Sequence, residues 1–204
     1  MSCRRADVQA FLVALRDVFA TLPLDAVAAR SIRDIFARID RSVGAMGQGG
    51  GSLPACAHLP EALGRVASAG HPFDAIATSF AAMAPALPWS RRSDGPHASA
   101  NIMEGHANAM VVGPGGLEAR DDVWIGASLL ARDTRYPDHR HPPEEVYLVL
   151  SPGEFRQGEG PWFEPGFGGT FFNSPEILHA MRSGPHPLFA IWCLNPPGTV
   201  QSHA

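Results

Sequence analysis

Residues 136–147 read Tyr-Pro-Asp-His-Arg-His-Pro-Pro-Glu-Glu-Val-Tyr and lead directly into an apolar run. In an extended chain, residues separated by two lie on the same face. His139 and His141 therefore point the same way, and Glu145 and Tyr147 form a second such pair. The two prolines between the pairs permit a turn that folds one pair against the other. The stretch thus predicts a pocket of polar side chains at the entrance of a strand.

A third histidine and two tyrosines extend this cluster. His179 follows in a separate apolar segment, residues 177–181, and Tyr136 and Tyr147 are the only tyrosines in the chain. Imidazoles from two segments together with the Glu145 carboxylate form a donor set that suits a first-row divalent metal with an open coordination position. We therefore predict a metal site with two phenols beside it.

The composition describes a folded chain without a basic surface. Of the 204 residues, 45% are hydrophobic and 18% are charged, which is enough apolar material for a sizeable core. The formal net charge is −4, which argues against nucleic acid as a partner, because such binding requires a basic face. All 16 basic residues are arginine. The absence of lysine excludes Schiff-base chemistry and a lysine general base.

The cysteines and the N-terminal sequence favour a reduced, soluble protein. Cys3, Cys56 and Cys193 are isolated and match no disulfide or metal spacing. We expect them to be free thiols, which favours a cytoplasmic location. Arg16 ends the apolar run at residues 11–15 too early for a signal peptide or a membrane span. We therefore expect no membrane partner.

The first half of the chain has helical periodicity. Apolar residues recur at three- and four-residue steps, which predicts amphipathic helices over residues 8–22, 24–43, 61–69 and 72–87. Residues 44–52 contain five glycines and are typical of a flexible connector. This half contains no cluster of metal-ligating residue types, so we expect it to contribute packing and no chemistry.

After residue 95 the pattern changes to short apolar segments separated by glycine and proline. Such segments are typical of strands in an antiparallel sandwich or a small barrel, and they cover residues 109–112, 123–131, 145–150, 169–172, 177–181 and 188–194. We predict a mainly β protein with a helical N-terminal part (α+β). Its predicted parts are a helical segment, residues 1–95, and a catalytic β-barrel, residues 96–204.

The histidine and glutamate spacing resembles the first motif of the cupin superfamily, approximately G(x)5HxH(x)3-4E(x)6G. His139, His141 and Glu145 fit this motif, whereas Gly153 comes one residue late. The second cupin motif supplies another histidine, matched here by His179, but the customary asparagine a few residues beyond it is absent. The resemblance covers about residues 105–195 and implies a small β-barrel or jelly roll. It does not define an activity, because cupins host many functions.

A longer string runs Tyr136-x-x-His139-x-His141-Pro-Pro-Glu-Glu145-Val-Tyr147, continues to Ser151 and is followed by Trp162 and His179. It is similar to the cupin dimethylsulfoniopropionate (DMSP) lyases, particularly the DddQ type, which also have a helical N-terminal segment. The resemblance implies a carbon–sulfur lyase that splits DMSP into dimethyl sulfide and acrylate. It implies that His141, Glu145 and His179 are metal ligands and that Tyr147 is a fourth, displaceable ligand. It also implies that His139 lies beside the metal, either as a ligand or as a group on the substrate side.

The same resemblance gives Tyr147 and Tyr136 as candidates for the catalytic base, with His139 as a further catalytic residue. Elimination requires removal of the proton next to the carboxylate. A phenol with a pKa of about 10 is a poor base at neutral pH unless a dication lies beside it. We favour Tyr147, and expect Tyr136 to orient the substrate or to act as the base itself. We expect Trp192 and Trp162 to contact the sulfonium group by cation–π attraction.

Two other functions stay open at the level of sequence. A different metal-dependent cupin enzyme, such as a dioxygenase, would use the same metal ligands without the paired tyrosines. A non-catalytic cupin would bind a small ligand without turnover. The donor set suits zinc, iron, manganese, cobalt or nickel, and which of them occupies such a site often follows availability. We expect one such divalent ion, a small-molecule substrate as the partner, and a monomer or a homodimer.

Overall fold

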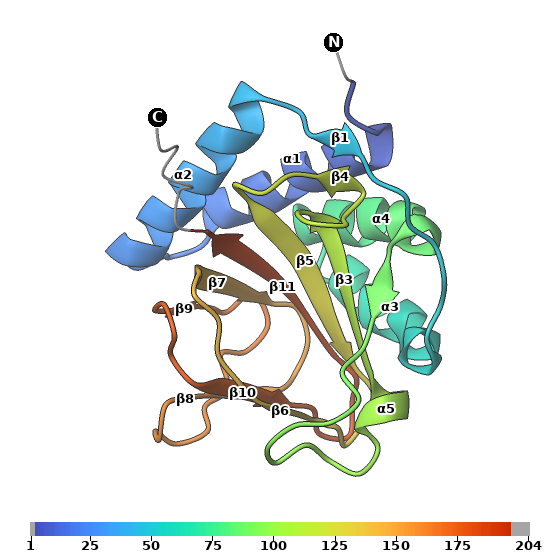
Figure 1. Ribbon diagram of the computed structural model, residues 1–204, viewed down its shortest axis with the longest axis vertical. Helices are drawn as coiled ribbons and strands as arrows, with labels where there is room; N and C mark the ends of the chain where they lie inside the picture. The colour runs from blue at the N-terminus through green and yellow to red at the C-terminus, as the bar shows by residue number, and fades with distance from the viewer. Residues whose placement is uncertain (1–2, 197–204) are drawn as a thin grey trace, which may run out of the picture.

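The computed structural model describes residues 3–196, so residues 1–2 and 197–204, the outer ends of the two predicted parts, lie outside the described chain. Helices come first and strands follow (Figure 1). The helices, including two 3-10 turns, are α1 (Ala6–Thr21), α2 (Ala26–Arg41), η1 (Pro54–His58), α3 (Leu59–Ser68), α4 (Phe73–Met83), η2 (Ala84–Ala86) and α5 (Ile102–Gly105). The strands are β1 (Ala45–Met46), β2 (Trp89–Ser90), β3 (His106–Val112), β4 (Glu118–Ala119), β5 (Trp124–Leu130), β6 (Arg135–His139), β7 (Glu144–Val149), β8 (Glu154–Gln157), β9 (Thr170–Asn173), β10 (His179–Arg182) and β11 (Leu188–Asn195).

The four long helices lie within a few residues of the segments that show apolar periodicity. α2 illustrates why its boundary falls where it does. The side chain of Asp25 accepts hydrogen bonds from the backbone N–H groups of Val27 and Ala28 and so caps the helix. Arg38 and Arg41 occupy its last turn, where positive charge is favourable. Among the described helices, none combines the length and the hydropathy that a bilayer crossing requires.

Two sheets enclose the barrel. The larger has the strand order β1-β4-β3-β5-β11-β7-β9, with β2 beside β3, and the smaller has the order β6-β10-β8. In Figure 1 the smaller sheet lies across from β7 and β11, on the side away from the long helices. The predicted strands correspond to β3, β5, β7, β9, β10 and β11. The expected flexible connector is partly ordered, because Ala45–Met46 forms β1 and pairs with β4.

Alternation along the central strands separates two cores. On β11, Ile191 and Cys193 face the core between the sheet and the helices, whereas Trp192 and Leu194 face the interior of the barrel. Strand β7 follows the same two-residue period, which turns Tyr147 toward the barrel interior. The period therefore positions Tyr147 and Trp192, because the residues on either side of each pack against the helices.

The helices do not form a core of their own. The larger cluster of buried hydrophobic residues combines members of α1 to α4 with members of β3, β5, β7 and β11, such as Phe11, Phe80 and Phe189. The Phe80 ring packs edge-on against both Phe11 and Phe189, with centroid distances of 5.8 and 5.0 Å. The helical segment thus supports the back of the sheet whose front lines the barrel.

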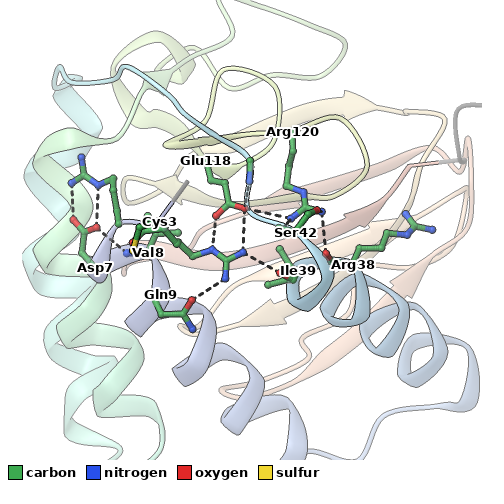
Figure 2. A network of polar contacts seen from close by, with 12 residues as sticks. Cys3, Asp7, Val8, Gln9, Arg38, Ile39, Ser42, Glu118 and Arg120 are labelled. Carbon is green, nitrogen blue, oxygen red and sulfur yellow. Dashed lines mark hydrogen bonds and ion pairs between the residues drawn. The ribbon is translucent and has the colours of Figure 1, made fainter. Parts of the chain in front are cut away.

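A buried carboxylate ties the N-terminal segment to the barrel. Glu118 of β4 forms ion pairs with both Arg4 and Arg120, and Figure 2 shows Glu118 and Arg120 within this network. The Arg4 Nε atom donates to Glu118 Oε2 at 2.5 Å, the Arg120 Nη1 atom lies 3.3 Å from Oε1, and the Gly44 N–H donates to the same oxygen at 3.0 Å. Arg4 also donates to the carbonyl of Ile39 at the end of α2. One buried carboxylate therefore links the N-terminal segment, α2 and the β1–β4 edge of the larger sheet.

Replacing Glu118 by glutamine is expected to lower the free energy of unfolding by about 3 kcal/mol, because it leaves the buried Arg4 without its counter-charge and leaves Arg120 with Asp122 alone. Burial alone raises the pKa of Glu118, but the hydrogen bond from Arg4 and the other positive contacts outweigh it, so the net pKa is lowered. This stabilisation is fully present above the carboxyl's ordinary pKa and is lost as the pH falls through the lowered folded value. Urea unfolding at pH 7 and at pH 3 measures both effects.

The matched control is Glu154→Gln, which breaks the ion pair between Glu154 and Arg182. Both partners are about one-third exposed or more, so this change is expected to cost less than about 1 kcal/mol. Equal destabilisation by the two substitutions at pH 7 would contradict a special role for the Glu118 network.

Candidate active site

Three imidazoles meet at one end of the smaller sheet. His139 is the last residue of β6, His179 is the first of β10, and these two residues are paired in the antiparallel register. The ring centroids of His139 and His179 are 4.0 Å apart, and those of His141 and His179 are 5.0 Å apart. One nitrogen from each ring lies within 4.8 Å of the other two. The pairing of β6 with β10 thus joins two motifs that are far apart in the sequence.

Backbone carbonyls fix the orientation of all three rings. The Nδ1 atoms of His139, His141 and His179 lie 3.0, 2.9 and 2.9 Å from the carbonyl oxygens of Pro137, Pro143 and Ile177. A carbonyl oxygen only accepts, so each Nδ1 carries the proton and each Nε2 keeps a free lone pair. This is the arrangement in which histidine ligates metals.

Glu145 completes the donor set from β7. Its Oε2 atom lies 3.4 Å from both His141 Nε2 and His179 Nε2. Asn173 of β9 lies opposite Glu145 in the strand register and donates from Nδ2 to the same oxygen at 2.8 Å. Gln157 in turn donates to the Asn173 Oδ1 atom at 2.7 Å. The carboxylate is therefore held in place by a chain of amides that reaches across to the smaller sheet.

Burial keeps two of the rings neutral. It lowers the pKa of His139 to about 3, reinforced by the neighbouring His179, and it also lowers the pKa of His179. For His141, burial acts in the same direction, but the Glu145 carboxylate outweighs it and raises the pKa. The Nε2 atoms of His141 and His179 are buried and have no hydrogen-bond partner among the described residues. Buried lone pairs without a partner, beside a carboxylate, fit a bound cation.

The cluster opens into a cavity of about 370 Å³, a size suited to a small molecule. Its polar wall consists of Ser90, Arg92, Asn108, Ser128, Tyr136, His139, His141 and Glu145. Its more apolar wall consists of Met110, Trp124, Tyr147, Met181, Trp192 and Leu194. Both tyrosines and Trp192, one of the two expected tryptophans, therefore face the same space as His139 and His141.

Tyr147 and Trp192 lie opposite each other on β7 and β11. The Tyr147 ring stacks on Phe171 with a centroid distance of 5.0 Å and an interplanar angle of 15°. Gly126 of β5 makes room for Trp192, since a Cβ atom at Gly126 would lie 2.2 Å from the indole ring. Burial, reinforced by the Glu145 carboxylate, raises the pKa of Tyr147 well above its ordinary value. The phenol becomes a base only if a positive charge opposes these two effects.

Tyr136 reaches the cavity from β6. The Asn108 Nδ2 atom lies 3.5 Å from its hydroxyl, and Ser128 Oγ donates to Asn108 Oδ1 at 2.7 Å. The His106 ring packs edge-on against Tyr136 with a centroid distance of 4.6 Å. Burial raises the pKa of Tyr136, and the Arg92 guanidinium and the Asn108 amide act against that shift. Tyr136 thus lies in a more polar setting than Tyr147.

Trp162 does not reach the cavity, and the expectation that it contacts the substrate is corrected. Its ring lies under the guanidinium groups of Arg182, Arg135 and Arg156 at 4.3, 5.2 and 5.3 Å. Those arginines alternate with Tyr136, Phe155 and Met181, which belong to the inner core, so they project from the opposite face of the smaller sheet. Sequence alone could not distinguish the two faces, because Trp162 lies outside any strand.

Replacing Asn173 by alanine is expected to weaken metal binding about 10- to 100-fold, because it removes the amide that orients Glu145. Competition with a chromophoric chelator measures the affinity. The control is Asn195→Ala, which removes an equivalent 2.8 Å hydrogen bond from the adjacent carboxylate, Glu144. Glu144 does not line the cavity, so metal affinity in that variant is expected to stay within about twofold. Unchanged affinity in Asn173→Ala would argue against Glu145 as a ligand.

Several cavity residues carry no recognisable sequence signal. Asn108, Ser128 and Trp124 lie on β3 and β5, within segments recognised only as apolar strands or their approaches. Asn173 ends β9, and Arg92 follows β2, in a segment that shows no periodicity in the sequence. Strand pairing brings these residues to the site, and no spacing rule would have found them.

Comparison with known proteins identifies the family of the chain. The family model for dimethylsulfoniopropionate lyase matches residues 27–190 of the chain. The DMSP lyase DddQ of Ruegeria pomeroyi is 28% identical over 120 residues, which span 58% of this chain and 60% of that protein's length.

Two solved structures share the fold over nearly the whole chain. The crystal structure of DddQ from Ruegeria pomeroyi DSS-3 has a TM-score of 0.72 at 23% identity, covering 96% of this chain and 93% of that one. A chain from the crystal structures of the DMSP lyases RdDddP and RnDddQII has a TM-score of 0.71 at 20% identity, covering 95% and 94%. The predicted fold, a cupin-type barrel with helices in front, is confirmed. With the family model matching most of its length, the chain belongs to the dimethylsulfoniopropionate lyase family.

Proposed function

We propose that this protein is a metal-dependent carbon–sulfur lyase that cleaves DMSP into dimethyl sulfide and acrylate by β-elimination initiated by a tyrosine. One observation carries the proposal. His139, His141, the Glu145 carboxylate and the phenols of Tyr136 and Tyr147 line one small cavity, and His179 lies directly behind them, in contact with Glu145 and the other two imidazoles. Membership of the DMSP lyase family supports the substrate.

The proposed metal ligands are His139, His141, His179 and Glu145. A divalent ion bound there supplies a positive charge that stabilises negative charge on a substrate carboxylate and lowers the pKa of a neighbouring phenol. The donor set suits zinc, iron, manganese, cobalt or nickel. Tyr147 is two residues from Glu145 on the same face of β7. This position supports Tyr147 as the phenol nearest the metal ion and as a displaceable metal ligand.

The reaction requires one proton transfer and one bond cleavage. The Tyr147 phenolate takes the proton from the carbon next to the carboxylate. The electrons of that C–H bond form the carbon–carbon double bond of acrylate, and the carbon–sulfur bond breaks with its electron pair remaining on sulfur. Dimethyl sulfide leaves as a neutral molecule, so its departure requires no general acid. Tyr136, held by Asn108, orients the substrate and is the alternative base.

The aromatic wall suits the other end of the substrate. Trp192 and Trp124 line the cavity, and an aromatic face attracts a sulfonium cation by about 0.5–2 kcal/mol, most strongly where water is excluded. Both Trp192 and Trp162 were expected to contact the sulfonium, and of these two Trp192 is the one that lines the cavity. The cavity thus offers a metal and phenols to the carboxylate half of DMSP and indoles to the sulfonium half.

Headspace detection of dimethyl sulfide tests the proposal. Purified, metal-loaded protein is expected to release the gas from DMSP under argon as fast as in air, because elimination consumes no oxygen. Activity that depends on oxygen would favour a dioxygenase instead, and a metal-loaded protein that releases no dimethyl sulfide would overturn the lyase assignment.

A further inference from the structure

Arg92 is a cation directed at the cavity without an anion to neutralise it. Within residues 3–196 it is the only arginine that lines the cavity, and its guanidinium forms no hydrogen bond or ion pair. The guanidinium carbon lies 5.7 Å from the centroid of the Tyr136 ring. The only carboxylate on the cavity wall, Glu145, is already engaged by Asn173 and the imidazoles. The cavity therefore presents a positive group whose contact within the described chain is the Tyr136 ring, with no anion beside it.

The position of Arg92 is determined by several contacts. β2 pairs with β3 through Trp89 and Ser90, which brings the chain to the edge of the cavity two residues before Arg92. The Arg92 backbone N–H then donates to His106 Nδ1 at 3.3 Å. His106 is only 1% exposed and packs against Tyr136, so it joins the Arg92 segment to the cavity wall.

Neighbouring arginines do not share this arrangement. Arg91 donates to the carbonyl of Met103 at 2.8 Å and lies 3.9 Å from Glu104. Arg135, on the other face of β6, forms an ion pair with Asp138 at 2.8 Å. These side chains serve structural contacts outside the cavity. Arg92 combines a position on the cavity wall with an unused guanidinium, whose planar donors match a carboxylate.

We propose that Arg92 binds the carboxylate of the substrate and thereby fixes which end of the molecule enters the polar half of the cavity. The inference rests on the proposed function and names the group that selects the substrate's anionic end. With the carboxylate held at Arg92 beside Tyr136, the indoles of Trp192 and Trp124, which line the same cavity, remain for the sulfonium. The reverse orientation would bring the sulfonium against a guanidinium, and like charges repel.

This contact also assists proton removal. The carbon acid becomes more acidic as negative charge on the adjacent carboxylate is stabilised, and a guanidinium donates two parallel charge-assisted hydrogen bonds to that group. Arg92 lies at the exposed mouth of the cavity, so solvent reduces its effect relative to a buried pair. We therefore expect its contribution to appear mainly in substrate binding, as a raised KM.

The test compares Arg92→Gln with Arg91→Gln, two identical substitutions at adjacent positions, in the metal-loaded protein. Isothermal titration with acrylate, a carboxylate without a sulfonium, and with trimethylsulfonium, a cation without a carboxylate, measures the two ends separately. Arg92→Gln is expected to weaken acrylate binding about 10-fold or more and to leave trimethylsulfonium binding within about twofold. Arg91→Gln is expected to leave both within about twofold.

Each result decides the inference independently of turnover. Acrylate affinity that is unchanged in Arg92→Gln, or parent protein that does not bind acrylate, would overturn it. Equal losses of affinity for acrylate and trimethylsulfonium would also overturn it, because they would show that Arg92 maintains the shape of the cavity and does not bind the carboxylate. If the selective loss of acrylate binding is seen but no dimethyl sulfide is released from DMSP, the carboxylate site stands and the proposed function fails.

Discussion

Replacing Tyr147 by phenylalanine is expected to slow dimethyl sulfide release at least about 100-fold, the scale of losing a general base. The substitution removes only the hydroxyl. The ring can keep its stack on Phe171 and its place opposite Trp192, so the fold and the cavity are expected to persist. Headspace measurement of kcat gives the effect, with the metal content of the variant measured alongside, because Tyr147 is also proposed to contact the metal.

Tyr136→Phe provides the comparison. It removes the hydroxyl next to Asn108 while the edge-on contact with His106 can remain. If Tyr136 only orients the substrate, its loss is expected to raise KM and to affect kcat less than the Tyr147 change does. Near-normal turnover in Tyr147→Phe, together with a large loss in Tyr136→Phe, would move the role of base to Tyr136.

Replacing His179 by alanine is expected to remove both the metal and detectable turnover. His179 is the proposed ligand that joins the smaller sheet to Glu145, whose Oε2 atom lies 3.4 Å from the His179 Nε2 atom. Loss of the Lewis acid costs several kcal/mol of transition-state stabilisation, which corresponds to about 10³-fold or more in rate. Metal analysis of the purified variant and headspace assay measure the two losses.

The control for this change is His186→Ala. His186 contacts Arg65, with Nδ1 3.1 Å from the guanidinium, and does not line the cavity. Its substitution is expected to leave metal content and turnover within about twofold of the parent. A His179→Ala protein that retains stoichiometric metal and activity would contradict the proposed metal site.

The parts of the fold that sequence could predict depend on local periodicity. The helices and the apolar strands can be predicted because one face of each is buried, which gives the sequence a periodic apolar pattern. The six segments predicted as strands correspond to six strands of the structure. β6 was not predicted as a strand, because its sequence Arg-Tyr-Pro-Asp-His shows no apolar alternation. β8 was also not predicted. It is short, and only Phe155 of its four residues is buried. β1, β2 and β4 contain two residues each and are defined by their partners, so no periodic pattern can develop within them.

The site residues that could be predicted are likewise those that belong to a local sequence pattern. His139, His141 and Glu145 are close in sequence, and the pairing of β6 with β10 brings His179 to them as the cupin resemblance implied. Trp162 was misplaced, because its orientation depends on which face of the smaller sheet it covers. The customary asparagine after His179 is absent, and Asn173, which precedes it in the chain, binds Glu145 in the structure.

In the proposed reaction, a phenol in a cavity that holds a metal removes a proton from DMSP, and dimethyl sulfide is released. The most direct measurement quantifies dimethyl sulfide and acrylate together, from DMSP incubated under argon with metal-loaded protein and with chelator-stripped protein. The proposed mechanism predicts equal amounts of the two products from the loaded protein, essentially none from the stripped protein, and recovery when a divalent metal is restored. Full activity after complete removal of the metal, or loss of DMSP without acrylate, would contradict it.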